Sequence, residues 1–495
     1  MGLNLAECLQ TTAEICPDKI AVTFEDTRLS YAELASAAMR VCNALRDRGI
    51  RPGDRVALML GNTPHFPIAY FGALHAGATV VTLNPGLRAR ELRYQLDDAG
   101  VSAIVVWHEC AAEAELARAE LPSCRVMLVV EPTLQPERPT VGESFVKALF
   151  TAAPHADMAQ TMPDDLAVIL YTSAMRGKPL GAQLTHFNLY NNADTISKYV
   201  LVYTPDDICM GVLPLFHGFG QTTMMNAAFL SRASVVLVPR FDAHRVYEAV
   251  HRDRVSLLAL VPTMFHFLVN YKREEQLDFS AVRVPISGGA PLPRAIAEEY
   301  ERRFGKPILE GYGLTETSPV VAFNRSTETN RPGSVGQAVP GTQVRVLRED
   351  GSVAPAGEVG ELVIRGHNVM LGYRNAPEVN EEVLQNGWFR TGDLGYIDND
   401  GTIFLTGLKK QMIIRAGMNV YPREVEACFR EHPDIAEVSV VGVPDPIRGQ
   451  EVKAYSVPRA GATLNERDLA HWWRERFAAY KCPKRFEIVD ALPTA

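Results

Sequence analysis

Helix-like stretches alternate with short apolar and β-branched runs from residue 31 to residue 130, and this alternation limits the fold more than any other feature. In order along the chain, we expect a helix over 31–47, a strand over 55–59, a helix over 67–76, a strand over 79–83, a helix over 91–99 and a strand over 103–107. Such cycles predict an α/β layer with a mostly parallel sheet.

The pattern changes twice further along the chain. Residues 131–165 are richer in Pro and polar residues and are typical of a surface connection, after which helix–strand cycles run from 185 to about 320. Residues 333–373 and 394–406 are shorter strands separated by Gly-rich turns, with a hairpin turn at 398–401. They suggest a small barrel or sandwich added to the main sheets.

A third pattern begins after residue 410. Pro422 is typical of the first turn of a helix, and two strand-like runs follow it. Leu469, Trp473 and Phe477 then recur at a spacing that puts them on one face of a second helix. This segment predicts a compact α/β domain at the carboxyl end.

Composition excludes several classes of protein. The 495 residues carry 50 Lys and Arg against 58 Asp and Glu, a net charge of -8, which argues against a nucleic-acid partner. The longest near-apolar stretch, 66–83, contains His75 and two glycines, so a packed helix and strand fit it better than a membrane span. The eight cysteines form no C-x-x-C pair. We expect a cytoplasmic protein with free thiols and no membrane span.

Four stretches could carry chemistry. Each has an ordinary structural interpretation that is about as good when it is taken alone, such as a surface turn or a capped helix start. They are the hydroxyl- and glycine-containing loop 172–179, the glycine-flanked aromatic of 311–317, the carboxylate loop 390–393 and the Gly/Lys-containing junction 407–426. His217 lies among apolar residues, where a lone histidine is more often part of the core than a catalyst.

Seven segments, in order, resemble the adenylate-forming superfamily of acyl-CoA synthetases, luciferases and peptide-synthetase adenylation domains. The sequence looks most like bacterial medium- and long-chain fatty-acid–CoA ligases. The segments are PLFHGFGQT (214–222), SGGAPLP (287–293), EGYGLTETSP (310–319), GELVIRGHNVMLGYRN (360–375), WFRTGDLGYID (388–398), GMNVYPREVE (417–426) and VVGVPDPIRGQEVKA (440–454).

This resemblance implies an α/β fold in two parts. A large N-terminal domain, 1–409, would contain two α/β sub-domains and a small β-barrel, and a hinge would join it to a small mobile α/β domain, 410–495. The implied reaction is that of an AMP-forming ligase. A carboxylate of a small-molecule acid attacks the α-phosphate of ATP, with Mg²⁺ bound, to give an acyl-adenylate and pyrophosphate. The C-terminal domain then rotates, and the thiol of CoA or of an acyl carrier protein takes the acyl group.

The resemblance also assigns residues. Tyr312 would stack on adenine, Thr315 would touch the α-phosphate, Glu316 would hold Mg²⁺ and Asp393 would bind the ribose hydroxyls. Four residues would act in catalysis or at the acyl pocket: Thr315, Glu316, His217 at the pocket mouth and Lys410 at the hinge. The remaining nucleotide and thiol contacts would come from Thr172, Ser173, Arg176, Lys178, Gly288, Gly289, Ala290, Gly313 and Gly417.

The sequence departs from the family pattern in three places. The phosphate loop has Ala174, Met175, Arg176 and Leu180 where the family has glycine, two threonines and lysine, so it offers fewer phosphate donors. Leu408 replaces an arginine that reaches the nucleotide. The family's adenylation lysine follows the Leu-Pro pair at 492–493, and the sequence ends at residue 495 before it.

These departures keep two alternatives open. One is an ATP-dependent enzyme of secondary metabolism with the same fold and changed chemistry, such as a diazotase that activates nitrite for an aryl amine. The other is a homologue that binds a ligand but no longer uses ATP. Glu316, Asp393, Tyr312 and Lys410 fit the family motif and argue against the homologue that no longer uses ATP. We rank the active ligase first and the enzyme with changed chemistry second.

Overall fold

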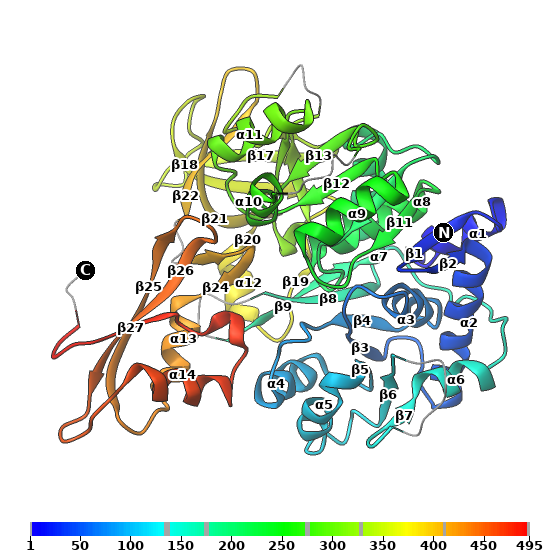
Figure 1. The fold of residues 1–495 in the computed structure, drawn as a ribbon, viewed down its shortest axis with the longest axis horizontal. Coiled ribbons are helices and arrows are strands. Elements are labelled where there is room, and N and C mark those ends of the chain that lie inside the picture. The colour runs from blue at the N-terminus through cyan, green and yellow to red at the C-terminus, as the bar shows by residue number, and fades with distance from the viewer. Residues whose placement is uncertain are drawn as a thin grey trace.

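The computed structural model describes residues 2–132, 139–172, 178–272, 278–325, 330–408 and 412–492. Two large sheets with helices on their faces form most of the molecule, and a smaller sheet and a C-terminal unit lie beside them (Figure 1). This arrangement confirms the α/β expectation.

The first large sheet has eight strands in the order β19-β9-β8-β4-β3-β5-β6-β7. Its central strands are parallel, whereas β9 and β19 are antiparallel to their neighbours. The strands are β3 (Arg55–Met59), β4 (Thr79–Thr82), β5 (Ala103–Trp107), β6 (Val126–Val130), β7 (Glu143–Ser144), β8 (Leu166–Thr172), β9 (Leu180–Thr185) and β19 (Gly372–Tyr373). Its helices are α2 (Tyr31–Asp47), α3 (His65–His75), α4 (Ala89–Ala99), η1 (His108–Cys110), α5 (Ala111–Arg118) and α6 (Phe145–Thr151).

The second large sheet has nine strands in the order β16-β15-β14-β13-β12-β10-β11-β1-β2. They are β1 (Ile20–Phe24), β2 (Thr27–Ser30), β10 (Ile208–Gly211), β11 (Ser234–Leu237), β12 (Leu257–Leu260), β13 (Val284–Ser287), β14 (Leu309–Gly313), β15 (Val320–Phe323) and β16 (Gln337–Ala338). The helices of this part are α1 (Glu7–Ile15), α7 (His186–Thr195), η2 (Ile196–Val200), η3 (Gly220–Asn226), α8 (Ala227–Leu230), α9 (Ala243–Asp253), α10 (Pro262–Asn270), α11 (Arg294–Phe304) and η4 (Thr315–Thr317).

The segment expected to form a small barrel is a five-stranded antiparallel sheet. It contains β17 (Thr342–Leu347), β18 (Gly360–Gly366), β20 (Leu384–Gln385), β21 (Trp388–Ile397) and β22 (Ile403–Leu408), with α12 (Pro377–Val383) beside it. β21 and β22 form a hairpin through residues 398–402, as the turn residues predict.

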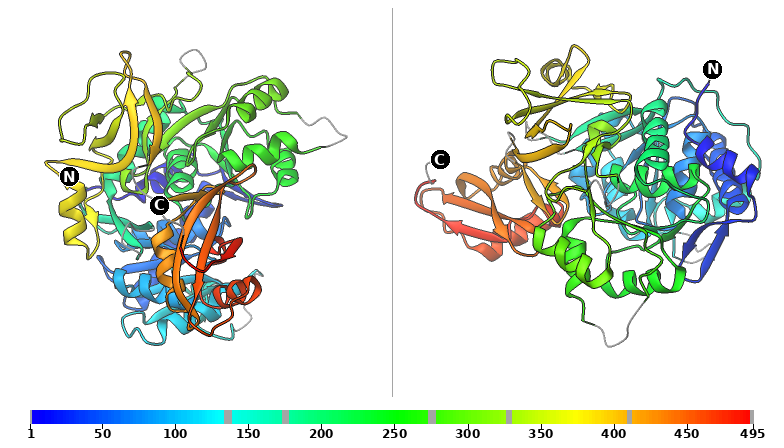
Figure 2. Two further views of the ribbon diagram at one scale, coloured as in Figure 1. Left: turned by 90° about the vertical axis from the view of Figure 1, so that its left-hand side faces the viewer. Right: turned by 90° about the horizontal axis from the view of Figure 1, so that it is seen from above.

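The C-terminal unit is α/β, as expected. Its sheet contains β23 (Ile413–Arg415), β24 (Met418–Val420), β25 (Ile435–Asp445), β26 (Gly449–Pro458) and β27 (Arg485–Ile488), and its helices are α13 (Pro422–Phe429), α14 (Glu466–Arg474) and η5 (Ala479–Lys481). In Figure 2 this orange-to-red unit lies at one side of the molecule. Its own core surrounds Phe429 and Trp473.

Two expectations need correction. Residues 131–165 are more than a surface connection, because they include strand β7 and helix α6, whose Phe145 is fully buried. The helix that carries Leu469 and Trp473 ends at Arg474, yet Phe477 still packs against Trp473 with ring centroids 4.7 Å apart. The chain leaves the helix here without leaving the core, which residue spacing alone does not reveal.

In the described part of the chain, no helix is long and apolar enough to cross a membrane. The eight cysteines are free thiols. Residues 66–83 form most of α3 and all of β4, as the interrupted apolar pattern predicts.

The buried imidazole of His186 predicts lower stability in mild acid. His186 is 1% exposed, and its Nδ1 accepts a hydrogen bond from the backbone N–H of Leu5 at 3.0 Å. Burial lowers the pKa of His186 from 6.5 to about 4. Below about pH 6.5, His186 is protonated in the unfolded chain but stays neutral in the folded chain until about pH 4. The free energy of unfolding therefore falls from about pH 6.5 toward pH 4, by up to about 3 kcal/mol.

Urea unfolding at pH 7 and pH 5 measures this effect. The replacement His186→Asn should destabilise the protein at pH 7 but make its free energy of unfolding less dependent on pH by about 2 kcal/mol over this interval. An unchanged pH dependence in the variant would show that His186 is not the group responsible.

Candidate active site

Three neighbouring parallel strands end at the same edge of the second sheet. β12, β13 and β14 are paired in parallel, so the residues that follow them gather there. These residues are Val261 after β12, Gly288 to Ala290 after β13, and the 3-10 helix η4 after β14. Carboxyl edges of parallel sheets are the usual place for ligand sites in α/β proteins.

Close packing explains two of the glycines around Tyr312. A Cβ on Gly311 would lie 2.1 Å from the ring of Phe323, and one on Gly313 would lie 2.1 Å from the carbonyl oxygen of Pro319. Neither space admits a side chain. The backbone therefore holds Tyr312 in one position, and its own side chain is 8% exposed.

Tyr312 and Asp393 meet although 81 positions separate them. The Tyr312 hydroxyl donates to Oδ2 of Asp393 at 2.5 Å, and the backbone N–H of Asp393 donates to Oγ1 of Thr391 at 2.9 Å. Burial, followed by the Asp393 charge, raises the pKa of Tyr312 well above its usual value. The residues expected at adenine and ribose thus form one unit, with β14 contributing one and β21 the other.

Glu316 is a buried carboxylate in η4, with 6% of its surface exposed. The hydroxyl of Tyr373 donates to its Oε1 at 2.5 Å, and the backbone N–H of Met370 donates to its carbonyl oxygen at 2.9 Å. Thr315, the expected α-phosphate contact, is half-buried next to it. Carboxylate oxygens are ligands that Mg²⁺ prefers.

Gly288, Gly289 and Ala290 lie where the resemblance puts the adenine pocket. A Cβ on Gly288 would lie 3.1 Å from the ring of Phe219, and the carbonyl oxygen of Gly311 would be 3.6 Å away. Gly289 has φ +80°, a conformation that favours glycine, and it is exposed. This bend therefore leaves an accessible surface beside the strand that carries Tyr312.

His217 is exposed, so the expectation of an ordinary core histidine does not describe it. Desolvation by the neighbouring protein nevertheless lowers its pKa below 6.5. Its Nδ1 accepts a hydrogen bond from the backbone N–H of Phe219 at 3.3 Å, and the imidazole is neutral at pH 7.

The phosphate loop is described only at its two ends. Thr172 is half-buried at the end of β8, and Lys178 is exposed with its Nζ 5.8 Å from the ring centroid of Tyr94. Ser173, Arg176 and the hinge residue Lys410 lie outside the described residues.

The C-terminal unit reaches the same edge. A Cβ on Gly417, which has φ +80°, would lie 3.0 Å from Cγ1 of Val261. Tyr421 is 8% exposed, its hydroxyl hydrogen-bonds with the Thr172 side chain, and it lies close enough to Glu316 and Asp393 for their charges to raise its pKa further after burial has raised it. The site is therefore built from both parts of the chain.

Two tyrosines at the site, Tyr373 and Tyr421, had no assigned role in the sequence. Both lie inside segments that carry the family resemblance, 360–375 and 417–426, and that was the available signal. Their partners, Glu316 and Thr172, come from distant segments, so only the fold reveals the contacts.

The donors suit a nucleotide with a bound metal ion. In the described residues, no group of three or more His, Cys, Asp or Glu is arranged for a metal by itself. A single carboxylate, such as that of Glu316, fits the usual mode of Mg²⁺ binding in nucleotide enzymes, where one or two carboxylates and the substrate phosphates share the coordination. A carboxylate such as that of Asp393 has about four acceptor positions, so it can accept hydrogen bonds from more than one hydroxyl group.

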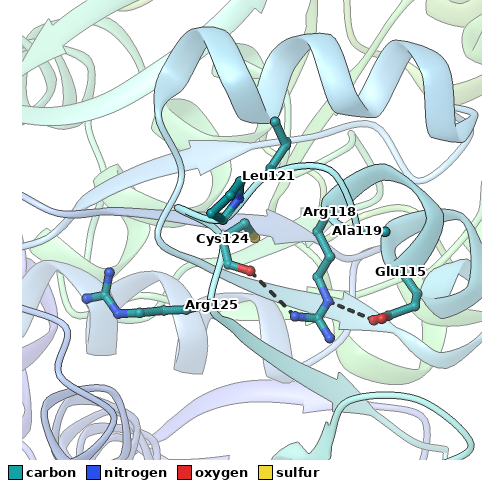
Figure 3. A pocket seen from close by; sticks show the side chains of 7 residues that line it. Glu115, Arg118, Ala119, Leu121, Cys124 and Arg125 are labelled. Atoms are coloured by element: carbon teal, nitrogen blue, oxygen red, sulfur yellow. Dashed lines mark hydrogen bonds and ion pairs between the residues drawn. The ribbon is translucent and has the colours of Figure 1, made fainter.

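A recess of about 280 Å³ lies between α5 and β6, away from these residues (Figure 3). Its polar groups pair with one another: Arg118 contacts Glu115 at 2.7 Å and donates to the carbonyl oxygen of Cys124 at 3.5 Å. Burial raises the pKa of the Cys124 thiol to about 11, so it is not a nucleophile at pH 7. This recess offers little to a ligand.

Comparison with known proteins identifies the family. Residues 9–374 match the AMP-binding enzyme family, and residues 424–495 match the AMP-binding enzyme C-terminal domain. The chain is 37% identical to a feruloyl-CoA synthase from Amycolatopsis, covering 97% of this chain and 94% of the relative. It is 33% identical to a long-chain-fatty-acid–CoA ligase from Bacillus subtilis, covering 99% and 92%.

Solved structures agree. An amide bond synthetase from Marinactinospora thermotolerans superimposes with a TM-score of 0.89 at 27% identity, covering 100% of this chain and 97% of that one. A mutant o-succinylbenzoate CoA synthetase from Bacillus subtilis, bound with its product analogue, gives 0.87 at 29% identity and covers 99% and 96%. ATP-bound MatB from Rhodopseudomonas palustris gives 0.77 at 32% identity and covers 100% and 96%. The chain therefore belongs to the AMP-binding enzyme family and is an ATP-dependent, AMP-forming acid–thiol ligase.

Proposed function

We propose that this ligase activates an apolar carboxylic acid, with aryl acids the first candidates, and transfers the acyl group to the thiol of CoA. One observation carries the proposal. Two buried carboxylates, Asp393 and Glu316, lie at one sheet edge, each accepting a hydrogen bond from a tyrosine, and Gly417 of the C-terminal unit packs against Val261 at that edge. The domain boundary near residues 409 and 410 is part of the same proposal.

Each side chain has a task in the first half-reaction. Asp393 binds the ribose hydroxyls while Tyr312, fixed by its bond to Asp393, presents a flat ring to adenine. Thr315 donates its hydroxyl to the α-phosphate. Glu316 would hold Mg²⁺, and the bound ion would supply positive charge to the phosphate oxygens. Lys178 adds a cation at the end of the phosphate loop.

The side chains around His217 support an apolar acid. Phe219 lies against Gly288, and a Cβ on Gly218 would lie 3.4 Å from Leu170. Desolvation lowers the pKa of His217, so its imidazole is neutral at pH 7 and presents no positive charge to the acyl chain. Feruloyl-CoA synthase, at 37% identity, and indoleacetate–CoA ligase from Aromatoleum aromaticum, at 34%, are both named for aromatic acids, and this supports aryl acids as the first candidates.

The position of the C-terminal unit supports thiol transfer. With nearly equal coverage, the structure resembles the relative bound with a CoA product analogue, at 0.87, more than the ATP-bound relative, at 0.77. The packing of Gly417 against Val261 and the contact of Tyr421 with Thr172 bring the C-terminal unit onto the nucleotide residues. A thiol that approaches along the loop that contains Gly417 would reach the acyl-adenylate from that side.

An acceptor assay tests this function. The protein is incubated with Mg-ATP and fatty acids, cinnamic-type acids or nitrite, in the presence of CoA, an acyl carrier protein or an aryl amine, and the products are identified by mass spectrometry. We expect a CoA thioester of an apolar acid with one AMP per thioester. An amide as the main product would show that the acyl acceptor is an amine and not CoA. The structural likeness to an amide bond synthetase makes this outcome worth testing. AMP that requires nitrite and an amine would instead establish the diazotase alternative.

A further inference from the structure

A buried lysine of the C-terminal unit bridges two carboxylates, one from each part of the chain. Nζ of Lys481 lies 2.8 Å from Oε1 of Glu91 in α4 and 2.6 Å from Oε1 of Glu424 in α13. The three side chains are 3%, 9% and 7% exposed. None of them belongs to the nucleotide site described above. We call this group the Lys481 triad.

The charges of the triad depend on each other. Burial alone lowers the pKa of Lys481, but Tyr480, Glu424 and Glu91 outweigh it and raise that pKa well above 10.5. Lys481 is therefore charged, and it separates two carboxylates that would otherwise repel each other inside the protein. Removing one member of a buried ion group is far more costly than its net contribution suggests, because it leaves a buried charge unpaired.

Further contacts join the same two surfaces. The backbone N–H of Ala478 donates to Oε2 of Glu91 at 2.7 Å, and Ala478 is fully buried in the apolar cluster that contains Leu92 and Leu96 of α4. Around this centre, Arg90 pairs with Glu431 in an exposed ion pair. Figure 1 shows the result, with α13 and α14 standing beside α4.

Helix α4 also supports the phosphate loop. The Tyr171 hydroxyl donates to Oδ2 of Asp98 at 2.6 Å, and the Tyr94 hydroxyl donates to the carbonyl oxygen of Pro179 at 2.9 Å. Tyr171 and Pro179 stand on either side of the loop. Glu91 therefore projects from a helix that is fixed to the nucleotide site, and a lysine bound to it places the C-terminal unit relative to that site.

We propose that the Lys481 triad positions the C-terminal unit for the transfer of the acyl group to the thiol. The inference rests on the proposed function, because it needs two half-reactions that can be measured separately. Lys481, Glu91 and Glu424 are positioning residues: they hold Gly417 against Val261 and Tyr421 against Thr172, and they contact neither the nucleotide nor the acyl group. Because the first half-reaction needs only the acid, ATP and Mg²⁺, the triad should matter mainly for the second.

The test measures both half-reactions in Lys481→Met. Acid-dependent ATP–pyrophosphate exchange reports the first, and single-turnover formation of the CoA thioester reports the second. We expect thioester formation to fall about 30- to 100-fold, since two buried carboxylates lose their shared cation, while exchange changes less than about threefold. Arg93→Gln is the matched control. Arg93 is in α4, like Glu91, but it pairs with the exposed Glu120 and not with the C-terminal unit, so its replacement should change neither rate by more than about twofold.

A second substitution separates positioning from damage to the fold. In the wild-type background, Glu91→Gln should lower thioester formation about five- to tenfold, because Lys481 loses one partner. In the Lys481→Met background the same substitution should raise it several-fold, because it removes one of the two repelling charges. Variants that simply misfold would not reverse the sign.

The outcomes are distinguishable. Acid-dependent exchange that is absent from the wild type would defeat the proposed function itself. Normal exchange and thioester formation in the wild type, with both rates lowered equally in Lys481→Met or with no sign reversal for Glu91→Gln, would overturn the inference about the triad alone.

Discussion

Replacing Glu316 by Gln is expected to lower acid-dependent AMP formation by about 100- to 1,000-fold, the range for losing one directed charge interaction in a dry active site. The glutamine has nearly the same shape and can still accept from Tyr373, so the fold should survive. It carries no negative charge for Mg²⁺, and the Mg²⁺ concentration at half-maximal rate should rise. Steady-state AMP formation across a range of Mg²⁺ concentrations measures both effects.

Tyr373→Phe is the graded control. It removes the hydroxyl that donates to Glu316 but keeps the carboxylate, so the rate should fall less than about tenfold. Unchanged activity in Glu316→Gln would remove the metal assignment, and with it the reason for placing the α-phosphate at Thr315.

Replacing Gly417 by Leu is expected to abolish most thiol transfer and to spare adenylate formation. Gly417 has φ +80°, and a Cβ there would lie 3.0 Å from Val261, so the side chain adds backbone strain and a clash at the contact between the two parts. Together these costs are about 3 kcal/mol, which corresponds to a loss of about 100-fold in thioester formation.

Gly461→Leu is the matched control for this prediction. Gly461 also belongs to the C-terminal unit and has φ +81°, but a Cβ there would meet nothing within 4 Å. It carries the strain without the clash. A loss of thioester formation as large in Gly461→Leu as in Gly417→Leu would show that strain in the C-terminal unit, and not its contact with Val261, is responsible.

Local patterns predicted the elements of the first sheet closely. The expected helix 31–47 and the strands 55–59 and 103–107 have the observed limits, because each element buries the face that its own apolar spacing defines. The prediction was wrong at 131–165, where α6 is a single short helix within a polar, Pro-containing segment. Because α6 has only seven residues, of which Phe145, Val146 and Ala148 are buried, its apolar residues do not form a recognisable helical repeat.

The candidate site was predictable in its parts and not in its contacts. Tyr312, Glu316 and Asp393 stood out once the motifs were aligned with a family, and the fold brings Tyr312 and Asp393 together. The bonds of Tyr373 to Glu316 and of Lys481 to Glu91 join residues 57 and 390 positions apart. Such pairs follow from how sheets and domains pack, and no local spacing encodes them.

ATP–pyrophosphate exchange in the presence of Mg²⁺ and a panel of aryl and fatty acids tests whether the protein forms an acyl-adenylate. We expect exchange that requires one class of apolar acid, proceeds without CoA, and is lost in Glu316→Gln. Pyrophosphate exchange that is independent of any acid, or ATP binding with no exchange for any acid while nitrite supports turnover, would contradict this expectation.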